Sequence, residues 1–423
     1  IEAKVVDEYG QPTSKRKITP PQWYDLYKDR FRINKVEDIR EEPPQSLDLP
    51  NKLKQTIIFA TRDTLAKLSN KQYLLINLLE GPLLALILAF IIKYKSAPDG
   101  QEYVFRFNDN FPAFMLMSII VALFMGLTVS AEEIIRDRKI LRRESFLNLS
   151  WNSYLMSKLM ILFTLSAIQT FSFVLLGNLI LEIEWRMLLP FWFILFTVSC
   201  FANVLGLNIS SAFNSAVTVY VMIPLLLIPQ MILSGLLFSF DKLNDLISTK
   251  GKVPVVADFM ASRWAYEALA VHQFVHNSYE EPYYKYEMYE TQADFKSSYL
   301  VDEMEKKRKF IQENIGEKSD SLQQVIQKEL TVIYHTLSKD YYKKGLEQEL
   351  SKPWTAAGFT PEFNKKLEEF FAAYRKFYQD AYNKAVIAKE AEMARLENEK
   401  DTDYSPNLFK DRYYNESLAD LVT

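Results

Sequence analysis

Long apolar runs alternate with short polar connections over residues 71–240, and a mostly charged and aromatic stretch follows them. A helix needs about 20 apolar residues to cross the hydrocarbon core of a bilayer. The runs meet that length, so they predict five membrane-spanning helices. The expected bounds of these helices are 73–94, 112–131, 155–181, 188–209 and 217–240.

A further helix is expected over 51–70, directly before the first apolar run. Its spacing is amphipathic: Leu53, Ile57 and Leu68 fall on one side, whereas Lys67 lies elsewhere. This pattern suits a helix that lies in the membrane interface. A plain soluble amphipathic helix is the alternative, and the span that follows directly favours the interfacial helix.

The second and third runs are joined by a charged segment, 132–150, which is predicted to be a stiff helix. A cluster of basic residues in a short loop between two spans is typical of the cytoplasmic side. The basic residues here are Arg136, Arg138, Lys139, Arg142 and Arg143. The N-terminus is therefore expected in the cytoplasm, where a neighbouring domain could push on this helix.

Polar segments flank the membrane part. Residues 1–50 are rich in proline and predict a linker with little core of its own, apart from a helical patch at 23–31. Residues 281–423 carry apolar positions at helical spacing and predict a helical extracytoplasmic insert. Because the chain begins at Ile1 without a signal peptide, and five spans precede an outer domain, we expect a longer protein with a sixth span beyond Thr423.

Composition excludes several function classes. A net charge of −3 over 423 residues gives no basic surplus for nucleic acid. The single Cys200 rules out an intrachain disulfide and a cysteine metal site. His272 and His276 can share a helix face, but no HExxH glutamate accompanies them, so no metal site is predicted. The sequence contains no GxxxxGK[ST], GxSxG or EF-hand pattern, and no catalytic residue is assigned.

The predicted spans contain some polar side chains. Glu80 lies about two turns into the first span, where an uncompensated carboxylate is costly. It is interpreted either as a gating or proton-linked group, or as a carboxylate paired with an arginine of the interfacial helix or connector. The amides are expected to form interhelical hydrogen bonds rather than a substrate route. They are Asn77, Gln169, Asn178, Asn203, Asn208 and Gln230.

Two stretches carry a resemblance to a known family. The first comprises Glu132, Asp137-Arg138-Lys139, Glu144, Ser153-Tyr154 and Lys158. The second comprises Ser234-Gly235-Leu236-Leu237, Arg263-Trp264-Ala265-Tyr266 and Gln273-Phe274. In this order and spacing, over about residues 50–280, the chain resembles the G-type subfamily of ABC exporters, the white and multidrug half-transporters with ABC-2 type membrane domains. Arg62 in the interfacial helix also fits that pattern.

The resemblance implies an all-α membrane protein with a type-V-like ABC-2 transmembrane fold. Two halves would pair as a homodimer, each with a nucleotide-binding domain that holds ATP and Mg²⁺, while this chain binds no cofactor itself. Residues 1–50 would be the tether from that domain, and 241–280 would fold back into or lie on the outer face. The long, cysteine-free insert departs from the short disulfide-bearing loop of animal members, and is expected to dock an extracytoplasmic partner or hand off a lipid-like substrate.

The resemblance also implies roles for particular residues. The helix 132–150 would couple ATP hydrolysis to transport through Glu132, Asp137, Arg138, Lys139 and Glu144. Leu236 and Leu237 would form an apolar plug above the cavity. The cavity would be lined by Met117, Ile120, Ile228 and Met231. Drug-exporting members carry an aromatic clamp where Met117 and Ile120 stand, which argues against flat polycyclic substrates, although methionine suits a pliable apolar site.

These observations predict the permease part of an ATP-driven exporter for an amphipathic or lipid-like molecule. It would be a multi-pass protein of the plasma membrane or bacterial inner membrane, with the lipid bilayer and a nucleotide-binding domain as partners. The alternative is a non-transporting membrane anchor that presents the helical insert to a partner protein. A passive channel is disfavoured because the spans have few polar faces.

Overall fold

The computed structural model describes residues 3–31, 50–95, 102–144, 150–244, 246–247, 251–316, 319–399 and 405–422. The chain divides into two compact units, Ile1–Pro50 and Asn51–Thr423. In the first unit, β1 (Lys4–Val6) and β2 (Pro12–Arg16) pair antiparallel and precede α1 (Pro20–Arg30). The prediction of a linker with one helical patch therefore missed a hairpin, which turns at Gly10 with φ +78°.

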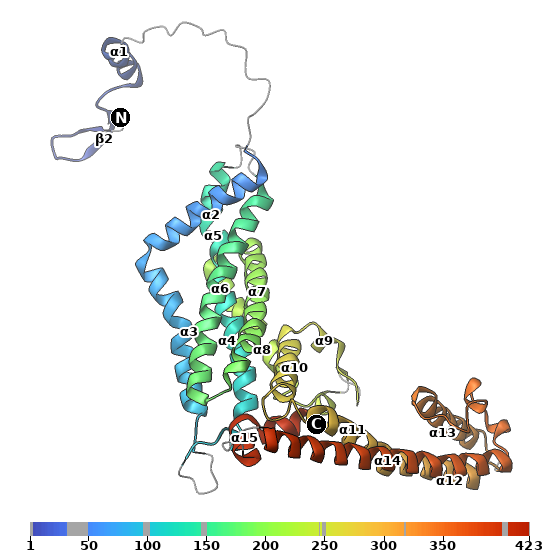
Figure 1. Cartoon of the computed structure of the whole chain (residues 1–423). Helices are drawn as coiled ribbons and strands as arrows, with labels where there is room; N and C mark the ends of the chain where they lie inside the picture. Colours follow the sequence, from blue (N-terminus) through green and yellow to red (C-terminus); the bar gives the residue numbers. More distant parts are fainter. Residues whose placement is uncertain are drawn as a thin grey trace. The chain divides into compact units, whose positions relative to one another are not determined.

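The second unit begins with a bundle of apolar helices (Figure 1). Four described helices are long and apolar enough to cross a membrane: Lys71–Ile92, Phe111–Glu144, Trp151–Leu181 and Trp185–Ala212. The all-α membrane architecture predicted from the sequence is thereby confirmed. The elements of the bundle are α2 (Lys52–Ser69), α3 (Lys71–Ile92), α4 (Phe111–Ser130), α5 (Glu133–Glu144), α6 (Trp151–Leu181), α7 (Leu188–Ala212) and α8 (Ala216–Ile232).

Helix α4 is the centre of the bundle and packs most closely on α7. Gly126 makes this approach possible: a Cβ built there would lie 2.6 Å from the Ser199 carbonyl oxygen and 2.7 Å from the Ala202 Cβ. Phe111, Phe114 and other large side chains of α4 are almost fully buried. The side chain of Phe114 also packs against Gly177 of α6, where a Cβ would lie 3.0 Å from its ring.

Helix α8 is shorter than the fifth predicted span. It covers 17 residues and ends at Ile232, so the predicted continuation to Phe240 is wrong. The chain turns instead through Ser234 and Gly235, and Gly235 has a φ of +91°, which side chains with a Cβ rarely adopt. Pro224 and Pro229 lie inside the helix and leave carbonyls without their usual amide donors.

Short elements cover the end of the bundle opposite α5. Helix α10 (Ala261–Val275) packs on α4 and α7, and Ser262 donates its backbone amide to the Gln230 side chain of α8 at 3.0 Å. Helix α10, in the segment 241–280 that was expected at or in the outer face, therefore packs across one end of the bundle. The other elements here are η1 (Phe105–Phe107), η3 (Trp185–Met187), η4 (Phe240–Lys242) and α9 (Val255–Asp258).

Residues 284–399 form helices with a separate apolar core. Within it, the buried Asp340 accepts hydrogen bonds from the hydroxyls of Tyr374, at 2.8 Å, and Tyr378, and pairs with Lys296 at 2.8 Å. The elements are α11 (Tyr284–Asp294), the π-helical η5 (Phe295–Leu300), α12 (Val301–Asn314), α13 (Asp320–Lys339), η6 (Glu349–Ser351), η7 (Ala356–Gly358) and α14 (Pro361–Glu399).

The last described residues pack on the bundle instead of joining the core of 284–399. They form α15 (Pro406–Tyr413) and α16 (Glu416–Val422). Asn415, between them, donates its amide to the Phe105 carbonyl at 2.9 Å, and Arg106 donates to Glu416 at 2.7 Å. The predicted insert 281–423 is thus divided, and only its larger part has a core of its own.

Candidate functional site: an ionic cluster and an apolar groove

A cluster of buried charges joins α2, α5 and α6. The Lys158 ammonium of α6 lies 2.8 Å from Glu133 Oε2, 2.9 Å from Asp63 Oδ1 and 2.9 Å from Asp137 Oδ2. Its side chain is only 3% exposed, so these carboxylates replace its hydration shell. Lys67 of α2 completes the cluster, 2.8 Å from Asp63 Oδ2 and 3.0 Å from Glu133 Oε2.

This arrangement holds charged groups where water is scarce. Burial alone would raise the pKa of Asp63, but the attraction of Lys158 and Lys67 outweighs burial and lowers the pKa below its usual 3.8. Asp63 is therefore ionised at neutral pH, and two ammonium groups face three carboxylates. The hydroxyl of Tyr154 donates to Asp137 at 3.0 Å and stabilises the remaining negative charge. Removing one member would leave a buried charge uncompensated.

Two arginines extend the contacts of α5. Arg62 of α2 pairs with Glu144 at 2.9 Å in a half-exposed position. Arg138 of α5 donates to the carbonyls of Ser211 and Phe213, at 3.1 and 3.0 Å, and to the Asn214 side chain. Since the last carbonyls of a helix lack amide donors, Arg138 caps the C-terminus of α7. Helix α5 is thus bonded to α2, α6 and α7.

The predicted coupling residues differ in what they touch. Asp137 and Arg138 make the contacts described above, whereas Glu132, just before α5, pairs with Arg136 at 3.4 Å and is hydrogen-bonded to the Tyr220 side chain of α8. Lys139 is exposed and has no hydrogen-bond or ion-pair partner in the part of the chain that the structure describes. The predicted connecting helix 132–150 corresponds to α5 up to Glu144, while 145–149 fall outside the described residues.

Asp63, Lys67 and Glu133 were missed as site residues. Lys67 was placed with the polar side of an interfacial helix, yet it is buried, while Leu53 and Leu68 are 73% and 55% exposed. The side of α2 that carries Lys67 therefore faces protein, whereas Leu53 and Leu68 lie on its open side. The spacing of Asp63 and Lys67, four residues apart on one helix face, was the available signal.

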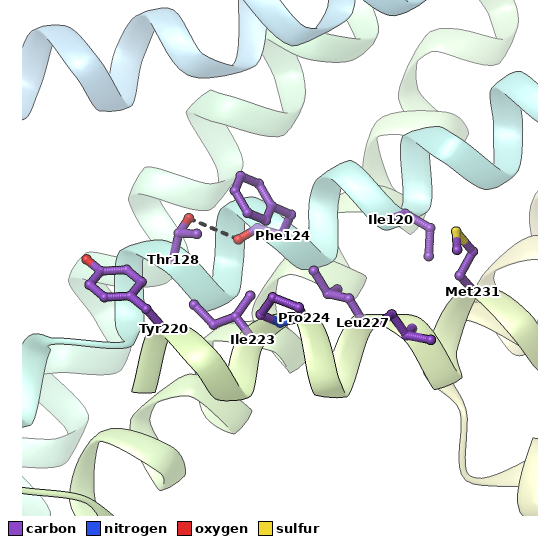
Figure 2. Close-up of a pocket in the computed structure, with 9 residues that line it drawn as sticks. Ile120, Phe124, Thr128, Tyr220, Ile223, Pro224, Leu227 and Met231 are labelled. Atoms are coloured by element: carbon purple, nitrogen blue, oxygen red, sulfur yellow. Dashed lines mark hydrogen bonds between the residues drawn. The ribbon is translucent and has the colours of Figure 1, made fainter. Parts of the chain in front are cut away.

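An apolar groove lies between α4 and α8 (Figure 2). Its volume is about 390 Å³, and polar atoms contribute almost nothing to its walls. It brings together Ile120, Ile228 and Met231, three of the four predicted cavity residues. The groove is lined by Ile120, Phe124, Thr128, Tyr220, Ile223, Pro224, Leu227, Ile228 and Met231.

The other predicted positions are not in the groove lining, and one residue that was not predicted is. Met117 is 39% exposed and is not part of the lining. Phe124, one turn beyond Ile120 on α4, does line the groove. An aromatic ring is therefore available on this helix, while the expectation against flat substrates, drawn from Met117 and Ile120, stays a prediction. Leu236 and Leu237 lie in the turn after α8, and Leu237 is 50% exposed.

Some polar side chains of the spans make the contacts that were predicted for them, and others do not. Glu80 accepts a hydrogen bond from Gln169 of α6 at 3.4 Å, and no arginine contacts it in the described part of the chain, so the proposed arginine pairing is wrong. Gln169 also donates to the Asn77 carbonyl at 2.9 Å, and Asn203 donates to Ser166 at 2.7 Å. These bonds join α6 to α3 and to α7. The Asn178 side chain, in contrast, has no hydrogen-bond partner among the described residues.

No group of described histidine, cysteine, aspartate and glutamate side chains is arranged to hold a metal ion. In the ionic cluster, lysines occupy the space between Asp63, Glu133 and Asp137 that a cation would need. The His272 and His276 rings are adjacent on α10, 4.7 Å apart.

The comparisons with known proteins bear on both features. A family model described as ABC-2 type transporter matches residues 54–274, more than half of the chain. The match runs from α2 into the last turn of α10, so it contains both the ionic cluster and the groove. Helices α11 to α14 lie outside it. None of the curated proteins compared with the chain matches it.

Proposed function

The chain belongs to the ABC-2 type transporter family, and on that premise we propose that it exports an amphipathic or lipid-like molecule as one half of an ATP-driven pump. A membrane domain of this family is the permease part of an ABC transporter and works in a membrane with an ABC nucleotide-binding partner. ATP and Mg²⁺ would bind to that partner, on the same longer chain or a separate one, because no GxxxxGK[ST] loop occurs in this sequence.

The ionic cluster around Lys158 is the observation that carries the proposal. Lys158 and Lys67 connect α5 to α2 and α6, and Arg138 connects α5 to the end of α7. Buried ion pairs are costly to break, so these helices move together when α5 is displaced. A nucleotide-binding partner that presses on α5 would therefore move the spans. The basic residues of α5 favour a cytoplasmic position for this end of the bundle.

The groove between α4 and α8 supports an apolar or amphipathic substrate. Phe124 and Tyr220 offer aromatic faces, while the hydroxyl of Thr128 is already bonded to the Phe124 carbonyl at 2.9 Å (Figure 2). With so little polar surface, the groove has no means of holding a strongly hydrated solute. A molecule with a large apolar part fits this lining.

We propose that a second copy of the chain faces this groove. Val217, Val221, Leu225 and Ile228 form a stripe at helical spacing along α8 and are 50–73% exposed. Across a two-fold axis, two such stripes and grooves would enclose one larger cavity. Leu236 and Leu237 would then meet their counterparts beyond the end of α8 and form the plug.

A functional assay tests the export hypothesis. The chain would be reconstituted with its nucleotide-binding partner in vesicles containing a fluorescent short-chain phospholipid analogue. We expect the analogue to stimulate ATP hydrolysis and to accumulate on the side opposite α5. A Phe124→Ala variant, which removes an aromatic face from the groove, should lose the stimulation but keep basal hydrolysis. If neither wild type nor variant responds to any apolar compound, export through this groove is wrong.

The separate core of residues 284–399 favours a second candidate function, a membrane anchor that presents these helices to an extracytoplasmic partner. The two functions differ in one result. An anchor would retain its role in Arg138→Lys, in which ATP hydrolysis is expected to be uncoupled from transport, whereas a pump would not. Both functions are compatible with a partner bound to α11–α14, and only the pump requires motion of α5.

A further inference from the structure

A second cleft lies at the end of the bundle opposite α5. It has a volume of about 770 Å³ and is bounded by residues 103–105, by 178–186 at the turn between α6 and α7, and by α15. This volume is in the range of sites for small organic ligands. The cleft shares no lining residue with the groove between α4 and α8, so it is outside the proposed transport path.

Asn178 gives this cleft an unsatisfied polar group. The residue lies in the last turn of α6, lines the cleft and is 3% exposed. Neither its side-chain oxygen nor its nitrogen has a hydrogen-bond partner among the described residues. Buried amides are nearly always satisfied, because an unpaired one costs its full desolvation free energy. An amide left open toward a cleft therefore points to a ligand with both donor and acceptor atoms.

The charges around the cleft narrow the class of ligand. Arg186 is engaged by Glu281 at 2.7 Å, and Glu182 by Lys93 at 2.7 Å. Arg412 of α15 has no carboxylate partner in the described part of the chain, and its guanidinium lies 5.6 Å from the centroid of the Tyr413 ring. A guanidinium fork that is free for two parallel hydrogen bonds suits a phosphate group.

Exposed apolar side chains in the cleft favour a lipid over a soluble phosphate ester, and its carboxylates favour a headgroup that carries a positive charge. Leu179, Trp185 and Leu408 line the cleft and are 51%, 60% and 60% exposed, so an apolar chain can lie against them. Tryptophan at the end of a span is typical of the membrane–water interface. The carboxylates of Glu182 and Asp411 keep acceptor capacity beyond their ion pairs, with 61% and 41% of their side chains exposed.

We propose that this cleft binds a phospholipid whose headgroup carries an ammonium group. Its phosphate is held by Arg412 and the Asn178 amide, its ammonium by Glu182 and Asp411, and an acyl chain lies along Leu179. Arg106 of η1 already pairs with Asp411 of α15 at 3.1 Å and donates to Glu416 of α16 at 2.7 Å, so the lipid adds a second link between the bundle and the C-terminal segment. Lipid binding at this site does not depend on what the groove transports, so a test that refutes one proposal does not refute the other.

Native mass spectrometry of the purified full chain tests this proposal. Dioleoylphosphatidylethanolamine would be titrated against dioleoylphosphatidylglycerol, which has the same chains but no ammonium. We expect tighter binding of the ethanolamine lipid, and a loss of about ten-fold in Arg412→Gln, the size expected for one charge-assisted hydrogen bond. Asn178→Leu should show a similar loss while its melting temperature is unchanged or higher, because it removes an unpaired buried amide.

Arg30→Gln removes an exposed arginine from α1 and is the control for charge loss. Equal binding of the two lipids, or equal binding by Arg412→Gln and Arg30→Gln, would overturn the site and indicate annular lipid. Soluble glycerophosphoethanolamine is the competitor that separates the two sources of the headgroup. If it displaces the lipid at equal concentration, the acyl chain contributes nothing and the ligand is a soluble phosphate ester instead.

Discussion

Lys158 of α6 donates a hydrogen bond to Glu133 of α5 over 2.8 Å, and both side chains are at least 95% shielded from solvent. The two residues are 25 positions apart in the sequence, one at the start of the charged connection and the other in the span that follows it. Their contact fixes the angle between the connection and the span that follows it. Because the same ammonium also touches Asp63 of α2, a change at this one position alters three helices.

Replacing Lys158 by methionine should destabilise the bundle strongly. Asp63, Glu133 and Asp137 would then face Lys67 alone, and breaking a buried pair in this way costs about 3–5 kcal/mol. Thermal unfolding in detergent measures the effect, with the exposed Lys139→Met as the matched control. The double variant Lys158→Met/Glu133→Leu should recover part of the loss. Equal melting temperatures for the two single variants would show that the cluster has no structural role.

Arg138→Lys tests coupling. Lysine keeps the charge but loses the fork, in which one nitrogen donates to the Ser211 and Phe213 carbonyls and the other to the Asn214 side chain. We expect ATP hydrolysis by the assembled transporter to persist while transport per ATP falls by roughly ten-fold, a typical size for a coupling free energy. Lys139→Ala, on the exposed side of the same helix, should leave the ratio unchanged. A normal ratio in Arg138→Lys would contradict the role given to the α5–α7 contact.

A methyl group at Gly126 should push α4 and α7 apart. The new Cβ would lie 2.6 Å from a backbone oxygen, which cannot rotate away. Overpacking of this kind costs about 1–3 kcal/mol, so Gly126→Ala should lower the melting temperature measurably. Gly316→Ala serves as the comparison because a Cβ there meets nothing within 4 Å. An unchanged melting temperature for Gly126→Ala would mean that the two helices can separate freely.

Glu280 predicts a pH dependence of stability. The residue is 1% exposed, and burial, together with the neighbouring Glu287, raises its pKa well above the usual 4.5; Lys389 and Lys410 oppose the shift only in part. The unfolded chain therefore releases this proton at lower pH than the folded chain, and stability falls as pH rises above 4.5.

In Glu280→Gln this loss should disappear. The variant should melt at a higher temperature than wild type at about pH 8 and at a similar temperature at about pH 5. Differential scanning fluorimetry across this range is sufficient. Parallel pH profiles for the two proteins would show that the carboxyl of Glu280 is ionised in the folded chain.

A cysteine cross-link tests the second copy. In a Cys200→Ser background, Val221→Cys should form a disulfide-linked dimer in membranes, because Val221 lies in the exposed stripe of α8. Leu83→Cys on α3 is 57% exposed but lies on another helix, and it should remain monomeric. A dimer through Leu83→Cys, with none through Val221→Cys, would place the second copy beside α3 and contradict a dimer interface at α8.

The sequence predicted helices well where apolar length alone decides, as in α3, α4, α6 and α7. It placed the end of the fifth span eight residues too late because Leu236 and Leu237 continue the apolar run, while the backbone turn at Gly235 depends on φ. Apolar patterning also could not show that Lys67 is buried. That requires Lys158 and Glu133, which come from distant parts of the sequence.

The lining of the groove was predicted only in part, because part of it depends on tertiary packing. A resemblance can assign Ile120 and Met231, since they stand at matching positions in a motif. Phe124 and Tyr220 join them only because α4 and α8 cross at a particular angle. Tertiary packing sets that angle, and no local pattern contains it.

The short α8 affects the surrounding lipid. With 17 residues and a rise of about 1.5 Å each, it spans about 25 Å, less than the hydrocarbon thickness of roughly 30 Å. Its neighbours α4 and α7 belong to helices long enough to match a full bilayer. The leaflet beside α8 must therefore thin or draw in headgroups, which lowers the barrier for a lipid that leaves its own layer there.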